Sequence, residues 1–271
     1  MPRKRYARPQ PIAVEIIPWL HELGSKAHEV SINYLENLPK NSVVAVEWSA
    51  REQAKAQKIL DEIQAKRDPD SFFKLESHSM ALLDALHTSQ ARNFLLKPVR
   101  SRTGELAIKK YVRELVPPVT VGKVVKQELA SIRLEEGFSS GIAAIAGSKK
   151  KPLKITALVG VGHVAGLARL LQERGIKAII KTSLFDANTR SQFEEFIAGS
   201  EIQRRALERQ AYQPFLQQYA VLAQMLKPLQ APNELATAKA GLDVWSKICK
   251  ANDSRIARIA RKAALKKTFG S

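Results

Sequence analysis

The sequence contains a single cysteine, Cys249, and few aromatic residues. One cysteine excludes an internal disulfide framework and a zinc site built only from cysteines, and it fits a reducing compartment. Aromatic residues make up 6% of the 271 residues. This low share argues against a protein surface that stacks the bases of single-stranded nucleic acid.

Long apolar runs are also missing. The longest candidate, 155–171, is interrupted by His163 and Arg169, and a membrane-spanning helix needs about 20 apolar residues. The basic start of the chain is followed by an apolar stretch of only 12–20, which contains Glu15 and Pro18. We therefore expect neither a secretory signal nor a membrane span, and we expect a cytoplasmic protein.

Acidic residues are few: 26 Asp and Glu stand against 44 Lys and Arg, which gives a net charge of +18. Such a chain attracts polyanions, although a proteome of generally basic proteins would give the same balance. Residues 254–271 contain no acid, and the pattern predicts a helix over 254–268. One stripe of this helix would bind nucleic acid or another polyanion through Arg255, Arg258, Lys262 and Lys266.

Hydrophobic residues make up 45% of the chain, which is enough for a globular core. The pattern predicts an α/β fold, with a mostly parallel sheet flanked by helices and a C-terminal all-helical extension. We divide the chain into a basic flexible arm (1–10), an α/β domain (11–200) and a basic helical extension (201–271). No internal repeat is present.

Apolar runs and capping signals predict the elements of the α/β domain. Val43 to Glu47 is a continuous apolar run typical of a strand buried on both faces. Ser49 and Glu52 form a capping box that starts the next helix. Further elements are expected as strands over 12–17, 155–159 and 176–181 and as helices over 25–38, 77–96, 123–146, 164–174, 189–198, 201–226 and 233–249.

Two details of these helices can be tested directly. The helix over 123–146 is expected to bury Val125, Leu129 and Ile132, which are spaced along one face. Gly175 stands where a left-handed C-terminal cap belongs.

The turn Gly160-Val161-Gly162-His163 is the candidate site of chemistry. Gly160 and Gly162 allow a sharp turn and a close approach to a ligand, and the following helix offers free amides. A histidine there faces the crevice at the carboxyl end of the sheet, where it can ligate a metal or move a proton. The simpler interpretation is that His163 only caps the helix.

The same turn also reads as Gly160-x-Gly162-x-x-Ala165, a dinucleotide-binding fingerprint. The acid expected at the end of the next strand is absent. Lys181-Thr182-Ser183 stand there instead and could receive a 2′-phosphate. A nucleotide-binding enzyme is therefore a further alternative.

Two other segments contain candidate groups. His21 and Glu22 lie in a turn between a strand and a helix, and His28 lies in the first turn of that helix. In the simpler interpretation, His21 and His28 are ordinary polar turn residues. Glu47 ends a buried strand, so its carboxylate must be paired, bound to metal or placed at the edge of the sheet.

These residues resemble the TraB/PrgY–Tiki family, in the wider superfamily with erythromycin esterase and ChaN-like proteins. Residues 157–167 are similar to the family's second Gly-x-x-His motif, and Val44-Ala45-Val46-Glu47 is similar to its strand that ends in glutamate. Gly24 to His28 is similar to the first motif, with one additional residue between glycine and histidine. The resemblance covers roughly 12–60 and 130–182.

The resemblance implies a metal-dependent hydrolase, of a group whose proposed activities include peptidases. It implies a divalent-metal site formed by His28, Glu47 and His163, with His21 or Glu22 able to replace His28. Such a donor set suits Zn, Mn or Co with one position open for water. Glu47 and His163 would then be catalytic, and Glu22 is the candidate general base.

Overall fold

The structure is a computed structural model. It describes residues 13–20, 25–65, 77–101, 106, 121–148, 152, 154–208, 241–244 and 246–248. The predicted arm (1–10), Cys249 and the basic helix over 254–268 lie outside these residues. The division into an α/β domain and a helical extension therefore stays a prediction at its C-terminal end.

The described residues form a five-stranded sheet in which every pair of neighbouring strands is parallel. The strand order is β3-β2-β4-β1-β5. This order places β1 between β4 and β5, with Trp19 opposite Gly160 in the register. The bounds are β1 Ala13–Trp19, β2 Val43–Val46, β3 Leu95–Pro98, β4 Ile155–Gly160 and β5 Lys177–Ile180.

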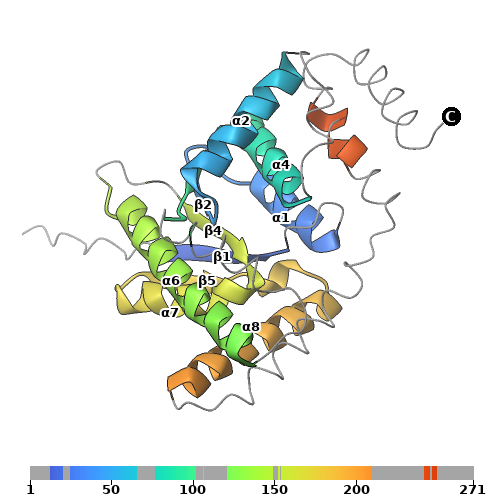
Figure 1. Ribbon diagram of the computed structural model, residues 1–271. Helices are drawn as coiled ribbons and strands as arrows, with labels where there is room; N and C mark the ends of the chain where they lie inside the picture. The colour runs from blue at the N-terminus through green and yellow to red at the C-terminus, as the bar shows by residue number, and fades with distance from the viewer. Residues whose placement is uncertain are drawn as a thin grey trace, which may run out of the picture.

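Helices cover both faces of the sheet, as Figure 1 shows. One face packs against α1 (Lys26–Glu36), α2 (Ala50–Gln64) and α4 (Ser77–Arg92), and the other packs against α6 (Val121–Ala146) and α7 (Val164–Glu173). Short 3-10 helices η1 (Val161–His163) and η2 (Thr182–Leu184) follow β4 and β5, and α8 (Ala187–Glu208) packs against α7, η1 and η2.

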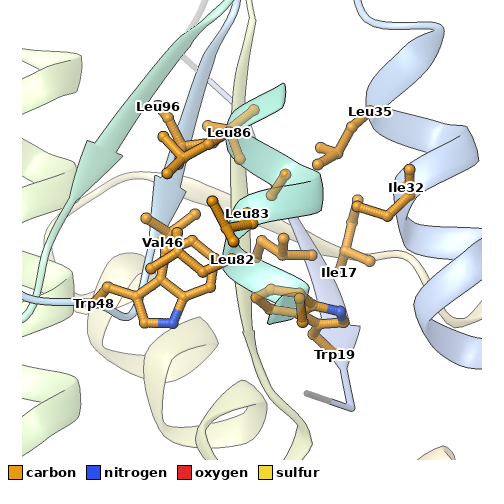
Figure 2. Close-up of a cluster of buried hydrophobic side chains, with 14 of the residues drawn as sticks. Ile17, Trp19, Ile32, Leu35, Val46, Trp48, Leu82, Leu83, Leu86 and Leu96 are labelled. Carbon is orange, nitrogen blue, oxygen red and sulfur yellow. The ribbon is translucent and has the colours of Figure 1, made fainter. Parts of the chain in front are cut away.

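Each face buries its own apolar cluster because alternate residues of a strand point to opposite faces. Ile17 and Trp19 of β1 join the α1/α2/α4 cluster, whereas Val14 and Ile16 join the α6/α7 cluster. Figure 2 shows the first cluster, in which Leu82, Leu83 and Leu86 of α4 lie between the strands and α1. None of the described helices is long and apolar enough to cross a membrane.

Several local predictions are confirmed. All four residues of β2 are buried, and the reciprocal hydrogen bonds of the Ser49–Glu52 capping box start α2. Val164, Leu167 and Leu171 form the buried face of α7. Gly175 follows that helix with a φ of 71°, the left-handed conformation that favours glycine.

Three helix predictions need correction. The predicted helix over 77–96 ends at Arg92, because Asn93 takes a left-handed φ of 56° and edge strand β3 follows. The two helices predicted over 189–198 and 201–226 begin as one, α8, which runs through Gly199 without a break.

The predicted buried face of the helix over 123–146 is also wrong, since Leu129 is 48% exposed. The buried apolar residues of α6 recur every four positions instead, as Ala130, Leu134, Phe138, Ile142 and Ala146.

A polar cluster lies on the face of the sheet that α1, α2 and α4 cover. There Glu15 of β1 meets Tyr34, Lys154 and Lys181. Lys154 Nζ lies 2.8 Å and Lys181 Nζ 3.7 Å from the Glu15 carboxylate, and the Tyr34 hydroxyl donates to it. Burial raises the pKa of Glu15, but the hydrogen bonds from Lys154 and Tyr34 and the charges of the lysines outweigh burial. The net pKa of Glu15 is lowered.

Replacing Glu15 by Gln should make stability less dependent on pH. A lowered folded-state pKa stabilises the fold above the unfolded value of 4.5, and this stabilisation is lost as pH falls through the folded pKa. At pH 7 we expect Glu15→Gln to lose about 1–2 kcal/mol of unfolding free energy. Urea unfolding at pH 7 and pH 3 should show a difference from wild type that shrinks at the lower pH; a constant difference would contradict the assignment.

Candidate active site

The strand order itself marks one place where a ligand crevice should form. The helices that follow β1 and β2 cover one face of the sheet, whereas the helix that follows β4 covers the other. Strand β4 lies between β1 and β2. When the connections after two neighbouring strands lead to opposite faces of the sheet, a crevice is expected between the carboxyl ends of those strands. In this protein that position coincides with the turn Gly160 to His163.

Glu47 is brought to this turn. It follows β2, which is paired with β4, and its Oε2 accepts a hydrogen bond of 2.7 Å from the Gly160 amide. The side chain is buried, with 6% of the residue exposed. The expectation that a carboxylate at this position must be paired is therefore met in part by a backbone amide.

His163 ends η1 and directly precedes α7, but its side chain makes no capping hydrogen bond to that helix. Its Nδ1 lies 3.2 Å from Oε1 of Glu135, and its ring meets the Phe138 ring edge-on at 5.6 Å between centroids. Both partners come from α6. The interpretation of His163 as a simple helix cap is thus not what the structure shows.

Glu135 is fully buried, whereas the His163 side chain keeps 20% of its surface exposed. Strands β3 and β4 run in the same direction, and α6 lies between them in the chain. The chain therefore has to return along the sheet, so α6 begins at the carboxyl edge and runs back to the start of β4. From Glu135 to the end of α6 the helix covers roughly 17 Å, which matches the roughly 20 Å length of β4. Glu135 therefore lies level with the carboxyl edge, where it orients the imidazole.

The two glycines of the turn are not needed for backbone conformation. Gly160 has a φ of −54°, and among the described glycines only Gly175 has a positive φ. A Cβ added at Gly162 would meet the Phe196 ring of α8 at 3.6 Å, an ordinary contact distance. Their expected role in binding a cofactor stays a prediction.

The dinucleotide interpretation finds little support in this geometry. In that motif the strand after the glycine-rich turn lies next to the first strand, whereas here β1 separates β4 from β5. The Gly160 amide donates to the Glu47 carboxylate, which would repel a diphosphate. Lys181, expected to receive a 2′-phosphate, lies 3.7 Å from the Glu15 carboxylate.

His28 packs on the opposite face from His163. It is 2% exposed and contacts Trp19 and Asp84, both of which belong to the α1/α2/α4 side of the sheet. Glu22 and His21 lie outside the described residues. Among the residues that are described, no group of three or more His, Cys, Asp or Glu is placed to hold a metal ion.

The metal-ligand set that the resemblance implies therefore fits the described residues poorly at His28. Both ring nitrogens of His28 face protein partners, Trp19 Nε1 at 3.2 Å and Asp84 Oδ2 at 3.1 Å. Glu47 and His163 are the members of the set that the structure brings to one turn. A metal site that includes all three residues stays a prediction.

Sequence reasoning missed Glu135 and Asp84, the acidic partners of the two histidines. A signal for each was present. Asp84 is the one acid in the apolar run Ala81 to Leu86, and Glu135 falls between the core positions Leu134 and Phe138. An acid inside an apolar helix face needs a partner, and a histidine is a common one.

Comparisons with protein-family models, curated proteins and solved structures found no match. The fold defines an open α/β protein with a parallel sheet. The resemblance to the TraB/PrgY–Tiki family stays a prediction.

Substitutions of Glu47 should separate its hydrogen bond from its charge. Glu47→Gln keeps an oxygen that can accept from the Gly160 amide, so we expect it to change stability little. Glu47→Ala removes the acceptor from a partly buried amide and should cost about 1–3 kcal/mol. Urea unfolding of both variants at neutral pH measures the difference, and equal losses would show that the contact with Gly160 is not what stabilises the turn.

Proposed function

We propose that the chain is a hydrolase of the TraB/Tiki kind in which His163, held by Glu135, transfers protons at the carboxyl edge of the sheet. The observation that carries this proposal is the pair formed by a fully buried Glu135 and a partly exposed His163. A carboxylate buried behind an imidazole fixes the orientation of the ring and stabilises its protonated form.

The imidazole suits this task because it is the side chain whose ordinary titration lies near neutral pH. With Nδ1 facing Glu135, proton transfer runs through Nε2. A water molecule gives a proton to Nε2 as its oxygen attacks a carbonyl carbon of the substrate. The same proton then passes from Nε2 to the leaving group, so the imidazole is regenerated.

Glu47 supports the turn on which His163 stands. Its bond to the Gly160 amide links the end of β2 to the end of β4, and η1 with His163 follows directly. The proposal gives Glu47 a positioning role in addition to the catalytic role expected from the sequence. A divalent metal would supply water activation if one were held here, and no step above depends on it.

Removing the proposed base should abolish hydrolysis. The assay is a panel of chromogenic ester and peptide substrates, with and without Zn, Mn or Co. For any substrate that wild type cleaves, we expect His163→Gln to lower kcat/KM by about 100-fold or more. Glu135→Gln should keep the fold and alter the acidic limb of the pH–rate profile.

A matched control is His87→Gln. His87 lies on α4, across the sheet from His163, and burial lowers its pKa. This variant should leave kcat/KM unchanged. Equal activity of wild type and His163→Gln on every substrate cleaved would contradict the proposal.

Polyanion binding is a second candidate function, favoured by the net charge of +18 and the acid-free stretch 254–271. We propose that Arg255, Arg258, Lys262 and Lys266 contact phosphates of a nucleic acid. This function and hydrolysis are compatible, because a basic tail can bring an α/β domain to its substrate.

Salt dependence tests the second proposal. For duplex DNA, the logarithm of the binding constant falls linearly with the logarithm of the salt concentration, and each phosphate contact adds about 0.9 to the steepness of this slope. Changing these four residues to Gln should therefore reduce the slope by roughly 3–4. Fluorescence anisotropy with labelled duplex DNA and RNA between low and moderate salt measures it. A slope equal to that of wild type would show that this segment makes no phosphate contacts.

A further inference from the structure

His28 lies between two buried partners from different elements. Its Nδ1 is 3.2 Å from the indole Nε1 of Trp19, at the end of β1, and its Nε2 is 3.1 Å from Oδ2 of Asp84 on α4. None of the three residues is more than 3% exposed. The histidine itself stands in the first turn of α1, where its amide donates to the side chain of the capping residue Ser25.

The indole partner determines where the imidazole proton sits. An indole N–H only donates hydrogen bonds, so Nδ1 of His28 must accept and cannot carry a proton. The proton of the neutral ring is then on Nε2, where it donates to the Asp84 carboxylate. A doubly protonated ring would set two N–H groups against each other at Nδ1. The contact of His28 with Asp84 is therefore a hydrogen bond of a neutral imidazole.

This tautomer is incompatible with a role as metal ligand. A ligating histidine offers the lone pair of one nitrogen to the metal and donates its other N–H to an acceptor. In His28 the lone pair of Nδ1 already accepts from Trp19. A metal at Nε2 would require an imidazolate, with neither nitrogen protonated.

We propose that His28 is a structural connector, which joins the end of β1 to α1 and α4 through a neutral Nε2–H imidazole, and that it binds no metal. The chain thus departs from the ligand set that the family resemblance implies. The proposal is independent of the hydrolase activity, because His28 packs on the face of the sheet opposite to His163.

The direct test is nitrogen-15 NMR of the imidazole side chains in the full chain, titrated with Zn²⁺. We expect His28 to show a protonated Nε2 and an unprotonated Nδ1, both unchanged by excess Zn²⁺. Its signals are assigned as those lost in His28→Gln. A protonated Nδ1, or a Zn²⁺-dependent loss of the Nε2–H signal, would overturn the proposal whether or not the protein hydrolyses any substrate.

Two tryptophan variants provide a matched pair. Trp19 and Trp48 are both fully buried and meet edge-on at 5.2 Å, but the Trp48 Nε1 atom has no hydrogen-bond partner among the described residues. Trp19→Phe removes the donor to Nδ1, so the Nε2–H tautomer should no longer be the sole form. Trp48→Phe removes a similar ring volume without touching that bond, and it should leave the His28 tautomer unchanged.

Thermal unfolding complements the tautomer measurement. We expect Asp84→Asn, whose amide oxygen can still accept from Nε2, to lower Tm less than Asp84→Leu, which leaves Nε2–H buried without an acceptor. The difference should be about 3 °C or more for a domain of this size. A Tm for Asp84→Leu equal to that of Asp84→Asn would show that the hydrogen bond does not connect α1 to α4.

Discussion

The parallel sheet must be covered on both faces, and the rest of the structure depends on this constraint. Strands β2 and β4 are apolar and almost entirely buried, so helices have to pack above and below them. The chain meets this requirement by sending the connections after β1 and β2 to one face and the connection after β4 to the other. That division of the connections predicts a crevice at the carboxyl end of β4.

The two histidines show how the surroundings of a residue decide its chemistry. His28 lies in the first turn of α1 and His163 ends η1, directly after β4, and their local sequences are alike enough to suggest one shared site. In the folded chain each has a different acidic partner, on a different face. Enclosure between Trp19 and Asp84 makes one ring a structural group, whereas partial exposure beside Glu135 suits the other for proton transfer.

Sequence patterns failed where a helix carries more than one apolar stripe and where an edge strand is short. In α6, Val125, Leu129 and Ile132 are spaced along one stripe, and Ala130, Leu134, Phe138, Ile142 and Ala146 along another. The core buries the second stripe, so Leu129 stays exposed although its neighbour Ala130 is buried. Strand β3 has four residues with an alternating, half-exposed pattern, too few to distinguish from the end of a helix.

The parallel α/β class, the capping of α2, the buried run of β2 and the glycine that ends α7 could all be predicted from sequence patterns. These features depend on residues close together in the chain, so local pattern is enough to predict them. The position of β1 between β4 and β5, the contact of Glu47 with Gly160, and the pairing of Asp84 and Glu135 with the histidines follow only from the packing of the folded chain. Such pairings join residues from 28 to 113 positions apart, and they are set by how helices of different length pack on a shared sheet.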